Sequence, residues 1–297
     1  MLSSVTLSRG MPPVLTRREF LRTTTAASLS AAGLGYLAAA PAWAADAKLR
    51  VVDFHVHLDN STIAEVVALA TTRGMKFGIV EHAGTKLNDY PVVLSTDAEL
   101  TGYLGRLAGQ PVYIGIQAEW TDWRGCFSDA VLGEVDFVLS DPMTFPGPDG
   151  RRMKLWLPGA NVGDPATFMD RYTDWHVHIM ATEPLDILAH ATWLPAIIAD
   201  RYDEVWTEAR MRKIIDAAVQ HRVALEISGS KQVPRRAFLQ LAKAAGARFS
   251  FGSNGRYPQM GQIDYSLAMA RELNLQPSDL FTPAPPGQKP FQIRKLG

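Results

Sequence analysis

Cysteine is almost absent from this chain: among 297 residues, Cys126 is the only one. A single thiol excludes an internal disulfide and any metal site built from several thiolates. It also suits a protein that works in an oxidising compartment. Net charge is lacking too, because 30 Lys and Arg residues balance 30 Asp and Glu residues. We therefore expect neither a nucleic-acid partner nor binding to an anionic membrane surface.

A glycine-rich nucleotide-binding motif is also missing, since no G-x-G-x-x-G follows the first predicted strand, residues 50–57. Instead, apolar runs of strand length alternate with amphipathic helical stretches. The predicted strands are 50–57, 76–80, 112–118, 137–140, 185–188, 223–227 and 248–251. The predicted helices are 61–73, 97–108, 165–180, 204–220, 235–245 and 265–273.

Repeated βα units of this kind predict a parallel sheet. Seven such units in about 250 residues favour a closed barrel over an open sheet. We predict an α/β fold, a distorted (β/α)7 TIM-like barrel, as a single domain over residues 45–297. The Pro- and Gly-rich stretch 146–165 is predicted as a long loop over one barrel face, and 283–297 as a surface tail.

The first 44 residues have the pattern of an export signal. Arg17 and Arg18 stand just before an uncharged run, 23–40, and the small residues of Ala42-Trp43-Ala44 fit a signal-peptidase site. The pattern resembles a twin-arginine signal, which predicts use of the twin-arginine export machinery and a periplasmic or secreted protein. The alternative is an uncut anchor, but the run is weakly hydrophobic, so we expect no stable membrane span after cleavage.

Histidines and carboxylates gather where the predicted strands end. His55 and His57 close the first strand, and alternation along a strand puts both imidazoles on one face. His82, Glu119 and His190 close later strands. In a parallel barrel these ends meet at one face, where the chemistry is done. Imidazole and carboxylate ligands suit zinc, manganese or iron, so we predict a metal site there.

The segments FHVHL, VEH, GIQAE, ILAH, ALEIS and FGSN, taken together, resemble the polymerase and histidinol phosphatase (PHP) family. The resemblance implies a distorted seven-stranded barrel that holds two or three divalent metals, commonly in a phosphoesterase. It implies that Glu119 bridges two metals and that His190 binds the second one. The metal ligands expected from the resemblance and the strand ends together are His55, His57, His82, Glu119, Asp141 and His190.

The chain departs from the family pattern at two places. Met143 stands where the family has a histidine, and Asp141 can substitute as an oxygen ligand. The family's closing Gly-Ser-Asp-x-His is here Gly-Ser-Asn-Gly-Arg, 252–256. Asn254 can still offer a carbonyl oxygen, whereas Arg256 cannot bind a metal. We expect one or two metals rather than three, with Asn254 and Arg256 as catalytic residues and Arg256 holding an anionic substrate group.

Other polar residues have simpler interpretations. Asp53 is expected to orient the first strand or a ligand, and Asp59 to cap the following helix. Glu226 is left open between a site residue and a partner of a ligand. His176 and His178 lie on a predicted helix, where residues two apart do not share a face. We expect at most one of them to be buried and neither to bind metal.

The function that the sequence favours is a metal-dependent hydrolase, phosphoesterase-like, which acts on a small-molecule substrate with an anionic group. One alternative is an amidohydrolase-like enzyme that cleaves C–N or C–O bonds with the same ions. The other is a secreted barrel that binds a metal or a ligand without catalysis, which the altered closing motif motivates.

Overall fold

A computed structural model describes residues 49–59 and 61–294. The predictions for residues 1–44 lie outside these ranges. Among the described residues, no helix has the length and apolar character needed to cross a membrane.

Parallel strands form a closed ring in the order β1-β10-β9-β8-β5-β4-β2, and β1 pairs with β2 to complete it. A short additional strand, β3, pairs with β2. The strands are β1 (Val52–Val56), β2 (Lys76–Ala83), β3 (Val93–Leu94), β4 (Tyr113–Ala118), β5 (Phe137–Ser140), β8 (Ile187–Leu188), β9 (Ala224–Ser228) and β10 (Phe249–Gly252). The predicted seven-stranded TIM-like barrel is therefore confirmed.

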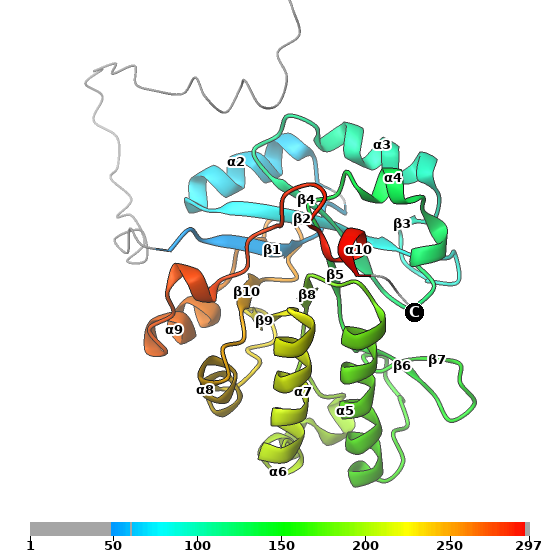
Figure 1. Ribbon diagram of the computed structural model, residues 1–297, viewed down its shortest axis with the longest axis vertical. Helices are drawn as coiled ribbons and strands as arrows, with labels where there is room; N and C mark the ends of the chain where they lie inside the picture. Colours follow the sequence, from blue (N-terminus) through cyan, green and yellow to red (C-terminus); the bar gives the residue numbers. More distant parts are fainter. Residues whose placement is uncertain (1–48, 60, 295–297) are drawn as a thin grey trace, which may run out of the picture. The chain divides into compact units, whose positions relative to one another are not determined.

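Helices surround the ring on its outside (Figure 1). They are α2 (Ile63–Arg73), α3 (Asp97–Leu107), α4 (Asp129–Leu132), α5 (Pro165–Thr182), α6 (Tyr202–Val205), α7 (Glu208–His221), α8 (Arg236–Ala244), α9 (Asp264–Glu272) and α10 (Pro290–Ile293). Local sequence fixes their ends: α2 begins with a capping box of Thr62 and Glu65 and ends at Gly74 in the left-handed conformation. The main core lies between these helices and the outward faces of the strands.

The amino-terminal end of the barrel interior is filled by aromatic rings. Phe54 packs edge-on against Phe137 and Phe281, with ring centroids 5.2 and 5.0 Å away. Gly78 and Gly115 leave the space that these rings need, because a Cβ at Gly115 would come within 2.5 Å of the Phe137 ring. We call this cluster the apolar layer; it makes the lower barrel a packed core.

A bulge in β1 changes which residues face inward. Between Asp53 and Val56 the strand advances three residues while β2 advances two, from Phe77 to Ile79. One extra residue reverses the alternation, so that Phe54 packs in the apolar layer and the adjacent His55 also faces the barrel interior.

The carboxylate of Asp53 holds this irregular segment in place. It accepts hydrogen bonds from the backbone N–H of His55 (3.1 Å), Ser253 (2.9 Å) and Gly261 (2.9 Å). The Ser253 hydroxyl donates to it as well, at 2.6 Å. These bonds tie β1 to the loop after β10, and they agree with the expectation that Asp53 orients the strand.

Several sequence predictions need correction. The predicted helix 204–220 is two helices, α6 and α7, because the Thr207 side chain caps a new helix at Arg210 N–H. The predicted loop 146–165 begins with an antiparallel hairpin, β6 (Thr144–Pro146) with β7 (Arg152–Lys154), which lies beside α5 (Figure 1). The predicted surface tail contains α10, whose Phe291 is buried. The cap of α2 is Thr62, whereas Asp59 accepts a hydrogen bond from Arg256.

Candidate metal centre

The predicted site residues lie at the carboxyl ends of six barrel strands or in the segments that directly follow them. They come from β1 (His55, His57), β2 (His82), β4 (Glu119), β5 (Asp141) and β8 (His190), and from the loop after β10 (Asn254, Arg256). The structure places the four predicted histidines in two donor groups, with Glu119 and Asp141 outside both.

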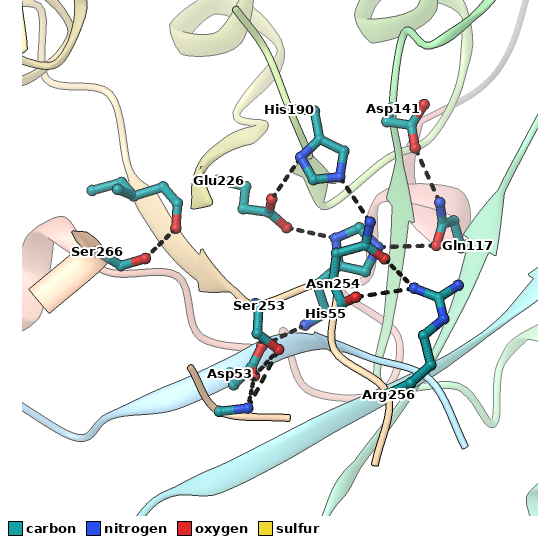
Figure 2. Close-up of polar contacts among 12 residues, drawn as sticks. Asp53, His55, Gln117, Asp141, His190, Glu226, Ser253, Asn254, Arg256 and Ser266 are labelled. Atoms are coloured by element: carbon teal, nitrogen blue, oxygen red, sulfur yellow. Dashed lines mark hydrogen bonds and ion pairs between the residues drawn. The ribbon is translucent and has the colours of Figure 1, made fainter. Parts of the chain in front are cut away.

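His55, His190 and Glu226 form the first donor group, and their ligand atoms lie within 4.8 Å of one another. All three side chains are fully buried. His55 Nδ1 is 2.7 Å from Glu226 Oε2, and His190 Nδ1 is 3.3 Å from Glu226 Oε1 (Figure 2). Glu226, which the sequence left open, therefore joins two of the predicted ligands.

Burial and charge act in opposite directions in this first group. Burial raises the pKa of Glu226, but neighbouring charges and hydrogen bonds, those of His55 foremost, more than offset it, so the pKa of Glu226 lies below its ordinary value and that of His55 above its own. Burial lowers the pKa of His190 to about 4, which Glu226 only partly opposes. His190 is therefore neutral at pH 7, the form in which an imidazole can bind a metal.

His57, Glu81 and His82 form the second donor group, again with ligand atoms within 4.8 Å of one another. His57 is fully buried, and neither of its ring nitrogens has a hydrogen-bond partner among the described residues. Burial and the neighbouring His82 hold the pKa of His57 well below its ordinary value. Burial and Arg256 lower the pKa of His82 to about 3. Both imidazoles are therefore neutral, with lone pairs available.

Glu119 lies next to this second group. Its Oε1 is 3.3 Å from His82 Nε2, and its Oε2 accepts a 2.8 Å hydrogen bond from the Tyr90 hydroxyl. Burial and the nearby Asp141 raise the pKa of Glu119 well above its ordinary value. Burial also raises the pKa of Tyr90, so its hydroxyl keeps its proton and donates.

Asp141 belongs to neither donor group. Its Oδ1 accepts from the backbone N–H of Met143 at 2.8 Å, and its Oδ2 accepts from Gln117 Nε2 at 3.0 Å. Gln117 in turn lies 3.1 Å from His55 Nε2, so Asp141 reaches the first group through an amide (Figure 2). Burial raises the pKa of Asp141 to about 6.

Asn254 and Arg256 close the site from the loop after β10. Asn254 Nδ2 is 3.4 Å from His190 Nε2, and Asn254 Oδ1 accepts from Arg256 Nη1 at 2.7 Å. Arg256 Nε donates to Asp59 at 2.7 Å, and the Arg256 side chain stays 41% exposed. The guanidinium is therefore partly exposed and partly held by its own loop.

The sequence did not identify three contributors to the site. Gln117 could have been found, because it stands two residues before Glu119 on one strand face. Glu81 is adjacent to the predicted ligand His82, but alternation along a strand predicts that neighbouring side chains point to opposite faces. Tyr90 comes from the loop 84–92, whose path a local pattern does not predict. The burial expected for the helical pair is confirmed, since His176 is buried and bonded to Tyr172 O at 2.6 Å whereas His178 is exposed.

The donor set fits a divalent ion. Two ligand atoms about 2.1 Å from a tetrahedral zinc lie about 3.4 Å apart. The pairs His190 Nδ1–Glu226 Oε1 and His82 Nε2–Glu119 Oε1, both 3.3 Å apart, match this separation. Both ring nitrogens of His57 are buried without a hydrogen-bond partner among the described residues, and His190 Nδ1 and Glu226 Oε1 face each other at 3.3 Å without forming a hydrogen bond. Buried polar atoms left in this state are costly unless something else binds them, and a cation would do so.

Three basic side chains act on the site by their positive charge. Arg256 acts to lower the pKa of His57, His82 and Glu119. Lys154, from β7, acts to lower the pKa values of His82 and Glu119. Lys231, from the loop after β9, acts to lower the pKa of His190. The site therefore combines the neutral imidazoles of His57, His82 and His190 with basic side chains around them.

No protein-family model and no curated protein matches this chain. Among the solved structures that match is the HpcH/HpaI aldolase from Desulfitobacterium hafniense DCB-2, with 11% sequence identity and a TM-score of 0.35. The match covers 68% of this chain and 86% of that chain. A likeness this weak supports no conclusion about this chain. The barrel and its site are established by the chain's own strand pairing and contacts.

Proposed function

We propose that this protein is a metal-dependent hydrolase of the PHP type, phosphoesterase-like, that uses one or two zinc, manganese or iron ions. The observation that carries the proposal is the pair of donor groups at the carboxyl ends of the barrel strands, in which both ring nitrogens of the buried His57 lack a hydrogen-bond partner among the described residues. In parallel barrels this end carries the catalytic groups.

The two donor groups define which residues would hold the ions. His55, His190 and Glu226 would hold one, and His57, His82 and Glu119, with Glu81 beside them, the other. The chemistry that a divalent ion supplies in such a site is Lewis-acid polarisation and a lowered pKa of the attacking water.

The chain's own residues supply proton handling and orientation. The buried carboxyl of Asp141 has a pKa of about 6, so it can take up or release a proton at Oδ1 or Oδ2 near neutral pH. Glu226 fixes the orientation of His55 through the 2.7 Å bond to Nδ1. Asn254 stands between His190 and Arg256 and couples the loop after β10 to the first group.

Basic residues whose charge acts on the site favour a substrate with an anionic group. Arg256, Lys154 and Lys231 all act on site residues by their positive charge. Arg256 also presents a planar fork suited to phosphate or carboxylate oxygens. A phosphate monoester or diester combines such a group with a hydrolysable bond. For residues 1–44, we propose a twin-arginine signal and a periplasmic or secreted location.

The test is a substrate panel assayed with protein that has been chelator-treated and then reloaded with zinc, manganese or iron. We expect phosphate esters to be cleaved by the reloaded protein and not by the chelated one, with amides and lactones as the comparison set. Preferred cleavage of amides or lactones would replace the phosphoesterase proposal with an amidohydrolase-like one. Full metal loading with no turnover across the panel would overturn the enzyme proposal.

A further inference from the structure

Tyr90 contacts two donor residues that come from different strands. Its hydroxyl donates to Glu119 Oε2 at 2.8 Å. Its ring stacks on the imidazole of His82, with centroids 3.8 Å apart and planes inclined by 8°. One side chain from outside the barrel wall therefore fixes both the direction of the Glu119 carboxylate and the plane of the His82 ring.

The hydrogen bond from the Tyr90 hydroxyl limits which carboxylate oxygen Glu119 can offer to an ion. Because Oε2 is bound by Tyr90, Oε1 is the oxygen that faces His82 Nε2, 3.3 Å away. A carboxylate held in this way can give one oxygen to an ion beside His82 while Tyr90 keeps the other. Partners of this kind, which bind a ligand's remaining atom, commonly change metal affinity by about 10–100-fold when removed.

We propose that Tyr90 is a positioning residue: it holds Glu119 as a one-oxygen ligand beside His82 and thereby sets the affinity of the second metal position. The proposal rests on the metal centre of the proposed function.

The loop that carries Tyr90 is anchored by hydrogen bonds at two positions before it, Thr85 and Asn88. Arg152, in the β6–β7 hairpin, donates to Asn88 Oδ1 at 2.7 Å and to Asp122 Oδ2 at 2.6 Å. The backbone N–H of Thr85 also donates to Asp122, at 3.2 Å, and Asn88 is buried. Fixed anchors at Thr85 and Asn88 keep the orientation of Tyr90 from depending on a free loop, which a positioning role requires.

Two further side chains lie near the Tyr90 ring. The Trp156 ring centroid is 6.3 Å away, and Lys154 Nζ lies 5.2 Å from the Tyr90 ring centroid. The ring of Tyr90 therefore has neighbours besides His82. A Tyr90→Phe variant keeps the ring between these neighbours and removes the hydroxyl contact with Glu119.

The experiment is a zinc titration of the chelator-stripped full chain in competition with a chromophoric chelator, which resolves each binding step. A His190→Gln background weakens the first donor group, so that the remaining tight step reports the second one. In that background we expect Tyr90→Phe to weaken zinc binding by about 10-fold or more. The matched control is Tyr265→Phe, in α9. It removes a hydroxyl that donates to Pro234 O at 2.7 Å, and it should leave zinc binding unchanged.

Three results would overturn the proposal: Tyr90→Phe binds zinc as the parent does, Tyr265→Phe weakens zinc binding equally, or the parent retains no tight step. Circular dichroism of each variant establishes that it is folded. Hydrolysis is not the readout, so the two proposals fail separately. Two zinc steps without turnover would reject the enzyme and keep the role of Tyr90, whereas turnover with an unaffected Tyr90→Phe titration would do the reverse.

Discussion

The amino-terminal half of the barrel interior holds Phe54, Phe137 and Phe281, whereas the carboxyl-terminal half holds the imidazoles and carboxylates of the two donor groups. The rings of the apolar layer interlock, and glycines opposite them leave the required space. The upper half keeps buried polar atoms, among them both ring nitrogens of His57, that have no hydrogen-bond partner among the described residues. Adjacent residues of β1, Phe54 and His55, belong to different halves. The difference indicates that the lower half stabilises the barrel. The upper half instead buries polar groups, which lowers stability.

The largest effect should come from the upper half. In a His55→Ala/His57→Ala double variant, we expect metal content per chain to fall below one equivalent, because each donor group loses an imidazole. Hydrolysis of any substrate found in the panel should fall by at least about 100-fold. Elemental analysis of protein purified without chelators gives the metal content. Unchanged metal content would show that the donors lie elsewhere.

A second prediction concerns the lower half. Phe137→Ala removes a fully buried ring that touches Phe54 and Phe281, and should lower the free energy of unfolding by about 3–5 kcal/mol. Metal stoichiometry of the folded variant should stay that of the parent, since the ring contacts no donor group. Urea unfolding and elemental analysis measure the two quantities. A loss of metal with little loss of stability would contradict the division between the halves.

A third prediction uses the buried carboxyl of Asp186, which precedes β8 and accepts from Val138 N–H at 2.9 Å. Burial raises its pKa to about 7 from 3.8. Between these values the folded state holds a proton that the unfolded state has released, so this group makes stability fall as pH rises, with no further loss above about pH 7. Below about pH 4 both states hold the proton and the contribution levels off.

Asp186→Asn keeps an oxygen acceptor for Val138 and removes the titration. The parent, stripped of metal, should therefore lose about 1.4 kcal/mol per pH unit relative to Asp186→Asn between about pH 5 and 7. Denaturant unfolding of both proteins at each pH measures the difference, in which the titration of other groups cancels. Parallel stability curves would show that the Asp186 carboxyl titrates alike in the folded and unfolded states.

The fold was predicted from the periodic spacing of apolar residues along the chain. Apolar runs and amphipathic stretches are local properties, so strands such as 137–140 were predicted with their observed bounds. The break between α6 and α7 escaped because the amphipathic pattern runs through it, although Thr207 is an ordinary helix cap. The β6–β7 hairpin escaped because its few residues are too short a pattern to distinguish from a loop.

By itself, the sequence determined the barrel and the polar residues at its strand ends, because strand alternation and βα repetition are set by neighbours along the chain. Tertiary structure alone decided how those residues are grouped. The bulge in β1 turned His55 inward beside Glu226, 171 residues away, and a loop held by Arg152 brought Tyr90 onto Glu119. Contacts between distant segments depend on strand register and loop path, which are fixed only when the ring of strands closes.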